Sequence, residues 1–77
     1  MTTIRFSRHA RERMRERRIA AREVEEALAS ALITTPGKSS DRVNRWGVTG
    51  RGRRLRITQP ADDPDYVITV VAPDEDD

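Results

Sequence analysis

The spacing of apolar residues changes once along this 77-residue chain, and that change limits what the chain can fold into. Between residues 6 and 32 the apolar residues recur every three or four positions, which is the period of a helix. After residue 41 the period is two, which is the period of a strand. Helices followed by strands favour an α+β fold. We therefore expect two N-terminal helices packed on one face of a three- to four-stranded, mostly antiparallel sheet.

Two helices are predicted in the first 32 residues. Ser7 is a good N-cap for a helix that starts at Arg8 and ends near Arg17 or Arg18. A short strand or extended lead-in over residues 3–6 precedes it. The second helix is predicted over residues 21–32, because its apolar positions form one continuous stripe: Val24, Ala27, Leu28, Ala31 and Leu32. The run from Thr34 to Gly37 then ends it.

Strands and turns are predicted in the rest of the chain. Residues 41–48 alternate, Gly50-Arg51-Gly52 is typical of a hairpin turn, and Leu55 and Ile57 are expected to face the helices. Arg54 and Arg56 would then project from the opposite, open face. After a turn over residues 60–65, the segment 66–72 is apolar on both faces, which predicts a central strand.

Length and composition restrict the organisation further. A chain this short forms one domain, which we place at residues 1–73, with a disordered acidic tail over residues 74–77. There is no cysteine, so disulfides and thiolate metal sites are excluded. No apolar run approaches the ~20 residues of a membrane span, and no signal peptide is visible. We expect a cytoplasmic protein without a membrane association and without a cofactor.

Charge is distributed unevenly. Residues 1–59 hold all fifteen Lys and Arg against six acids, whereas residues 60–77 hold seven acids and no base. Fourteen of the fifteen bases are arginine, whose planar donors match phosphate, so a polyanionic partner is favoured. The alternative is biased composition on solvated faces, and arginines 8, 11, 15, 18 and 22 are expected to be plain surface. The acidic tail is a candidate for folding back onto the basic face as a salt-sensitive competitor.

His9 is the only histidine, and histidine is the side chain type that ordinarily changes charge near neutral pH. On a helix, Arg13 and Glu16 lie on the same flank as His9. A histidine beside an arginine can carry out acid–base chemistry on a phosphodiester while the arginine holds the phosphate. The alternative is that His9 is a boundary residue that bonds a carbonyl or packs on Trp46.

Other basic residues extend this candidate site into a nucleic-acid surface. Arg17 continues the line from Arg13, although its stem could instead cover the core. Trp46 is interleaved with basic residues, and arginines with one aromatic ring suit single-stranded RNA. The alternative for Trp46 is packing in the core. The candidate nucleic-acid contacts are Arg17, Arg45, Trp46, Arg53, Arg54 and Arg56.

Two motifs are rejected. Gly37-Lys38-Ser39 lacks the first glycine of a phosphate-binding loop and follows a helix instead of a strand. Asp62, Asp63 and Asp65 lie in a proline-punctuated turn without the glycine and the final glutamate of a calcium loop. We expect a solvated turn there and no metal site.

The run from Phe6 to Ile19 resembles a known pattern. It reads FSRHARERMRERRI and matches S-x-H-A-x-x-R-M-x-x-R-x-I, the first helix of a family of small bacterial proteins of unknown function. That family is grouped with the toxins of the RelE/ParE superfamily. The late Ile68-Thr69-Val70 is similar to the family's closing strand. Arg18 stands where the family often has Gly, and Ala20 where it often has Ser or Thr.

The resemblance implies a toxin-like domain of two helices and an antiparallel sheet, with RNA, the ribosome or an antitoxin protein as partner. It makes His9, Arg13 and Arg17 the motif positions, with Thr69 on the last strand. We expect a metal-independent ribonuclease in which His9, Arg13 and Thr69 are catalytic. The alternative is a non-catalytic module of the same fold that binds nucleic acid or a protein partner. Reading of DNA by the second helix is disfavoured, because that helix carries Ala and Glu instead of base-reading side chains.

Overall fold

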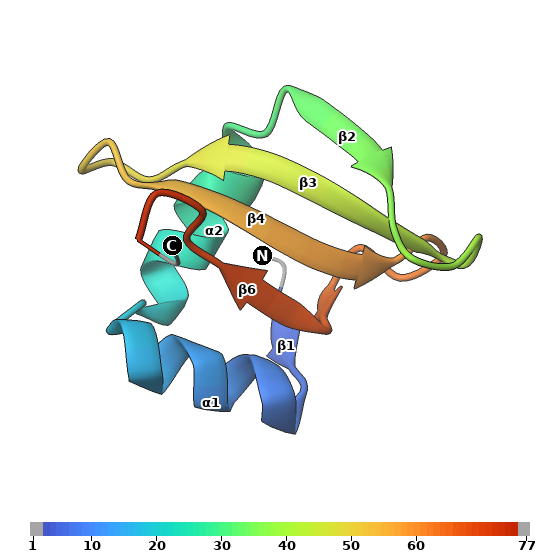
Figure 1. Cartoon of the computed structure of the whole chain (residues 1–77), viewed down its shortest axis with the longest axis horizontal. Helices are drawn as coiled ribbons and strands as arrows, with labels where there is room; N and C mark the ends of the chain where they lie inside the picture. The colour runs from blue at the N-terminus through green and yellow to red at the C-terminus, as the bar shows by residue number, and fades with distance from the viewer. Residues whose placement is uncertain (1–2, 76–77) are drawn as a thin grey trace.

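Two helices lie on one face of a four-stranded antiparallel sheet in the computed structural model, which describes residues 3–75 (Figure 1). The helices are α1 (Arg8–Arg17) and α2 (Ala21–Ala29). The sheet has the order β2-β3-β4-β6. Its strands are β2 (Ile33–Pro36), β3 (Arg42–Val48), β4 (Arg54–Pro60) and β6 (Thr69–Val71). The predicted α+β fold is confirmed.

Helix α1 has well-defined ends. The Ser7 side chain accepts a hydrogen bond from the backbone N–H of Ala10 at 3.0 Å, as expected of an N-cap. At the other end Arg18 adopts the left-handed conformation, with φ 55° and ψ 49°, and its N–H bonds back to the last turn. The predicted bounds of this helix are therefore confirmed.

Helix α2 is shorter than the predicted span of 21–32. It ends at Ala29, and the Ser30 hydroxyl bonds to both backbone groups of Val48 on β3, at 2.8 and 3.0 Å. The chain then turns into β2, where Ile33 pairs with Trp46. Leu32 does not complete an apolar stripe, since it is 95% exposed. The β-branched residues Ile33, Thr34 and Thr35 favour a strand, and the edge of β3 supplies the backbone partners.

The core lies between the helices and the inner face of the sheet. Leu55 and Ile57 of β4 are almost fully buried and face the helices, as predicted. Helix α2 crosses β3 so closely that a Cβ on Gly47 would lie 1.8 Å from the Ala27 carbonyl oxygen. Gly47 is therefore required by the close approach of two backbones.

The apolar segment 66–72 does not form the single central strand that its pattern predicts. It is divided into β5 (Tyr66–Val67), which pairs in parallel with β1 (Arg5–Phe6), and β6, which is an edge strand beside β4. The prediction of a central strand is wrong because burial here has another source. Helix α1 packs against β6, so the strand is covered without a second neighbour in the sheet.

The acidic end of the chain turns back over the start of β4 (Figure 1). Asp74 and Glu75 form part of a turn and bond to Arg54 and Arg53. A disordered stretch was expected over 74–77, whereas the first two of these residues are held against the sheet. Asp76 and Asp77 lie outside the described residues. Within residues 3–75, no helix is long and apolar enough to cross a membrane.

Candidate functional site

A cavity of about 380 Å³ lies where α1 meets the open face of the sheet. Four elements, α1, β3, β4 and β6, and the loop before β3 contribute to it, and its walls combine basic, hydroxyl and amide side chains. The lining residues are His9, Arg13, Lys38, Arg42, Asn44, Arg56, Thr58, Ile68, Thr69 and Val71. We call this the cationic cavity. It brings together His9, Arg13 and Thr69, the three residues that the sequence singles out as catalytic.

Ser7 explains why the start of α1 lies beside β6. Its backbone N–H donates to the Val67 carbonyl at 2.9 Å, and its hydroxyl donates to the Ile68 carbonyl at 2.5 Å. These two bonds join the first turn of α1 to the residues directly before Thr69. His9 therefore reaches the same cavity as Thr69, although sixty positions separate them in the chain.

The floor of the cationic cavity is a hydrogen-bonded set of polar side chains. The Thr58 hydroxyl donates to Oδ1 of Asn44 at 2.7 Å, across β3 and β4. Thr58 is also in register with Thr69 of β6, so the two threonines lie side by side. The hydrogen bond therefore fixes the orientations of the Thr58 hydroxyl and the Asn44 amide in the floor of the cavity.

Within residues 3–75, no carboxylate lines the cationic cavity, and this decides its electrostatics. Among the described residues, the side chains of Arg13, Lys38, Arg42 and Arg56 form no salt bridge. The Arg56 guanidinium lies 5.7 Å from the centre of the Trp46 ring. The neighbouring Asp41 carboxylate offsets part of the Arg42 charge. The four positive charges otherwise repel one another, and a bound anion relieves that repulsion.

Arg53 does not join this site, although the sequence groups it with Arg54 and Arg56. Its guanidinium donates to the carbonyls of Arg17 and Arg18 at 2.5 and 3.1 Å, which caps the end of α1. It also makes a two-pronged bond to the Glu75 carboxylate, at 2.6 and 2.7 Å. This hydrogen bond lowers the pKa of Glu75 and raises that of Arg53. Arg53 thus has a structural role, and its contact with nucleic acid stays a prediction.

The remaining predicted contacts are divided among different places. Arg54 projects beside the open face but is bonded to Asp74 at 2.8 and 2.9 Å, which lowers the pKa of that carboxyl. Arg45 lies on the helix-facing side of β3, where its Nε donates to Oε1 of the buried Gln59. Arg17 lines a separate cavity, together with Arg18, Arg51 and Glu75.

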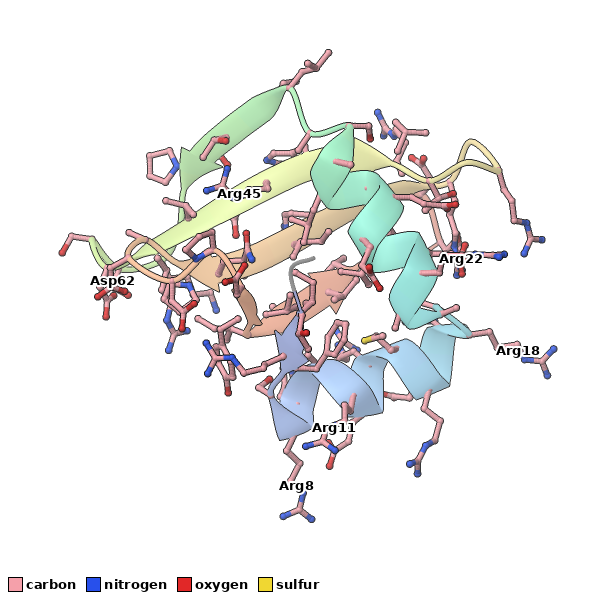
Figure 2. All side chains as sticks on the ribbon, turned by 180° about the vertical axis from the view of Figure 1, so that it is seen from behind. Arg8, Arg11, Arg18, Arg22, Arg45 and Asp62 are labelled. Atoms are coloured by element: carbon pink, nitrogen blue, oxygen red, sulfur yellow. The ribbon has the colours of Figure 1, made fainter. Side chains whose placement is uncertain are left out.

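Trp46 is half-buried on the open face and does not belong to the core cluster. Its indole N–H donates to the Thr35 hydroxyl at 3.0 Å, which holds the ring in place. On the helical side of the molecule, Arg8, Arg11, Arg18 and Arg22 extend outward from the two helices (Figure 2). That placement agrees with the expectation of plain surface for these arginines.

The sequence does not mark Lys38, Asn44 and Thr58 as site candidates, and it indicates Arg42 only as one of the basic residues near the sheet surface. The period of two contains the signal for three of them. From Trp46 it leads to Asn44 and Arg42, and from Arg56 it leads to Thr58. No comparable signal points to Lys38, which lies in the loop between β2 and β3.

The donor set of the described residues contains no group of three or more His, Asp or Glu placed to hold a metal ion.

Comparison with known proteins adds one finding. Neither a curated protein nor a solved structure matches the chain. A family model does match, over residues 6–76, and that span covers both helices, every strand of the main sheet and the acidic turn. The chain therefore belongs to the family described as domain of unknown function DUF4258.

Proposed function

We propose that this protein is a metal-independent ribonuclease of the toxin type, and that the cationic cavity is its active site. One observation carries the proposal: in the described part of the chain, a single histidine shares a cavity with four positive side chains and no carboxylate. Cations in this number suit the phosphates of a nucleic acid, and histidine supplies the proton transfer.

The chemistry follows from the groups present. His9 accepts the proton of a ribose 2′-hydroxyl as that oxygen forms a bond to the adjacent phosphorus. The bond from phosphorus to the 5′-oxygen breaks, and that oxygen takes a proton from water. The products are a 2′,3′-cyclic phosphate and a 5′-hydroxyl. Arg13 and Arg56 stabilise the additional negative charge on the phosphoryl oxygens in the transition state. Thr69 and Thr58 offer hydroxyls that position the phosphate.

The first helix resembles a family of unknown function that is grouped with the RelE/ParE toxins, and this grouping extends the proposal. It makes translating ribosomes a candidate setting for the cleavage, and an antitoxin protein a candidate partner. The positive side chains that line the cavity support a partner that is itself acidic, because such a partner would neutralise the cavity as RNA does.

A second candidate is a binding module of the same fold without catalysis. One observation favours it. Among the residues that the structure describes, the cavity offers one histidine and no carboxylate, so only one of the two proton transfers has an ordinary side-chain catalyst. If the protein is such a module, the same cations bind RNA, and His9 contributes little to the affinity.

The deciding experiment measures cleavage of a single-stranded RNA with a metal chelator present, for the wild type and for His9→Ala. We expect the substitution to lower the cleavage rate about 100-fold or more, with the dissociation constant for RNA changed less than about threefold. Glu12→Ala, on an exposed position of the same helix, is the control and should retain the wild-type rate.

Undiminished cleavage by His9→Ala would contradict the assigned role of His9. Tight binding of RNA without cleavage by the wild type would favour the binding module, and the assay would be repeated on translating ribosomes. An absence of both binding and cleavage at low salt would contradict both readings.

A further inference from the structure

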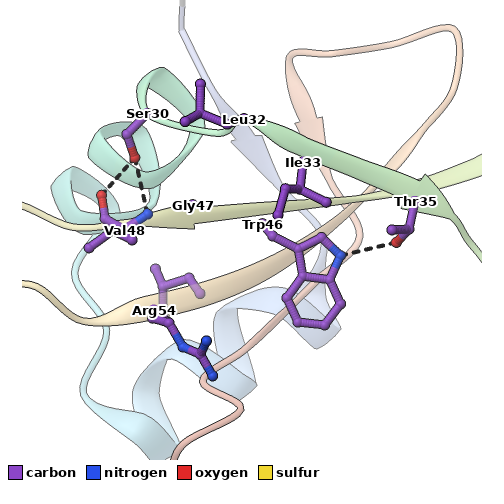
Figure 3. A pocket seen from close by; sticks show the side chains of 9 residues that line it. Ser30, Leu32, Ile33, Thr35, Trp46, Gly47, Val48 and Arg54 are labelled. Atoms are coloured by element: carbon purple, nitrogen blue, oxygen red, sulfur yellow. Dashed lines mark hydrogen bonds between the residues drawn. The ribbon is translucent and has the colours of Figure 1, made fainter.

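A second cavity, of about 370 Å³, opens near the other end of the same sheet (Figure 3). Apolar side chains provide most of its lining, in contrast to the cationic cavity. They are Leu32, Ile33, Trp46 and Val48, with Arg54 at the rim. We call this the apolar groove.

The apolar groove and the cationic cavity share a wall. Trp46 lines the groove but not the cationic cavity, whereas Arg56 lines the cationic cavity but not the groove. These two side chains stack on each other at 5.7 Å, so their pair separates the two spaces. The bond from the indole N–H to Thr35 holds this wall in one orientation (Figure 3).

The groove is made by apolar side chains that the fold leaves uncovered. Leu32, Ile33 and Val48 are 95%, 58% and 43% exposed, and they are the large exposed apolar residues of the described part of the chain. Leu32 and Ile33 belong to a segment, residues 27–37, that carries no charge, although 36% of all residues are charged. Contiguous exposed apolar surface of this kind marks a binding site.

We infer that the apolar groove binds a nucleobase of single-stranded RNA whose neighbouring phosphate occupies the cationic cavity. This inference rests on the proposed function and names its substrate class. A single strand presents an apolar base face and an anionic phosphate within one nucleotide. The two spaces on either side of the Trp46–Arg56 wall present the complementary surfaces in the same order. Paired bases are not available to such a groove, so duplex RNA is excluded from it.

Arg54 supports this assignment from the groove's rim. Its guanidinium is solvent-accessible and is held by Asp74, so a phosphate that follows the bound base can replace the carboxylate. The strand would then have one phosphate in the cationic cavity, a base in the groove, and the next phosphate at Arg54. A purely apolar protein segment would offer no charged group to the Arg54 guanidinium.

The test compares two ligands of equal length and charge: a single-stranded RNA, and the same ribose-phosphate strand without bases. Dissociation constants are measured at one low salt concentration. Because each stacked base contributes to binding, the RNA should bind about tenfold more tightly than the abasic strand. Trp46→Leu and Leu32→Ser should each reduce this preference without weakening binding of the abasic strand.

Tyr66→Leu is the matched control. Tyr66 is also an aromatic residue beside an arginine, since its ring centre lies 5.4 Å from the Arg5 guanidinium, but it lines neither cavity. The preference for RNA should be unchanged in this variant. Leu32 is so exposed that Leu32→Ser leaves the core intact, so this variant keeps the test valid if Trp46→Leu fails to fold.

Three results would overturn the inference. Equal binding of the two strands, with both weakened by Arg13→Gln, would reject the base subsite while the cationic cavity stands. If neither the RNA nor the abasic strand binds, the proposed function is rejected as well. If Leu32→Ser dissociates an oligomer and leaves the preference for RNA unchanged, the groove is a protein interface instead.

Discussion

Arg53 and Arg56 lie three positions apart on the same strand region and have opposite environments. Arg53 is bonded to two carbonyls and a carboxylate, and a second carboxylate, that of the buried Glu23, lies 3.5 Å from it. Arg56 has no salt bridge among the described residues and lines the cationic cavity. Arginine therefore stabilises the fold at position 53 and is available to a ligand at position 56.

Arg53→Ala should destabilise the protein strongly. The substitution removes the cap of α1 and leaves Glu23 as a buried carboxylate without its cation, so we expect a loss of about 2 to 4 kcal/mol in the free energy of unfolding. Arg53→Lys should recover only part of this loss, because an ammonium cannot bond the carbonyls and Glu75 at once. Urea denaturation measures both values.

Arg51→Ala is the control for this prediction. Arg51 is exposed in the neighbouring hairpin, and its removal should change stability by less than about 0.5 kcal/mol. Equal stability of Arg53→Ala and Arg51→Ala would show that the Arg53 contacts do not stabilise the fold.

At the scale of elements, the joint between α1 and α2 departs from ordinary helix-end geometry at two positions. Arg18 is the one non-glycine residue with positive φ among the described residues, and Ala20 precedes α2 without a side-chain cap. The Glu23 carboxylate compensates in part by accepting the Ala20 N–H at 3.0 Å. These are the two positions where the sequence departs from the pattern of the family it resembles.

Arg18→Gly should stabilise the protein. A left-handed residue with a Cβ costs about 1 kcal/mol relative to glycine, and the exposed Arg18 side chain extends away from the core. Arg15→Gly, in the same helix, removes the same charge but places glycine inside the helix. It should destabilise by a similar amount. Thermal unfolding should therefore move in opposite directions for the two variants, and a lower melting temperature for Arg18→Gly would contradict this account.

Elements with local signals could be predicted from the sequence. Ser7, the apolar stripe of α1 and the Gly50–Gly52 turn each act through neighbours in the chain. The end of α2 and the division of the last strand could not be predicted, because both depend on pairing with distant residues. Ile33 leaves the helical pattern to pair with Trp46, and Val67 pairs with Phe6.

The candidate site divides in the same way. Helical spacing and the motif of the first helix select His9 and Arg13, and alternation along β4 selects Arg56. The structure adds that Ser7 bonds the start of α1 to the residues before Thr69, which brings these groups into one cavity. The role of Arg53 depends on Glu75 and on two backbone carbonyls far along the chain, and no local pattern carries that information.

At the scale of the whole molecule, the acidic end of the chain neutralises one part of the basic surface and leaves another. Asp74 and Glu75 pair with Arg54 and Arg53 at the start of β4. The cationic cavity lies farther along the sheet and contains none of these acids. The net charge of +2 thus conceals a localised positive field, which is where a polyanion should be held.

The most direct test of that claim compares Arg13→Gln with Arg15→Gln. Both substitutions remove one positive charge from α1, and only Arg13 lines the cationic cavity. The measurement is the dissociation constant for a single-stranded RNA over a series of salt concentrations. We expect Arg13→Gln to weaken binding about tenfold at low salt and to reduce the salt slope by about one, because one phosphate contact is lost. Arg15→Gln should stay close to the wild type. Equal weakening by the two variants would contradict the account, because it would mean that RNA responds to overall charge and not to this cavity.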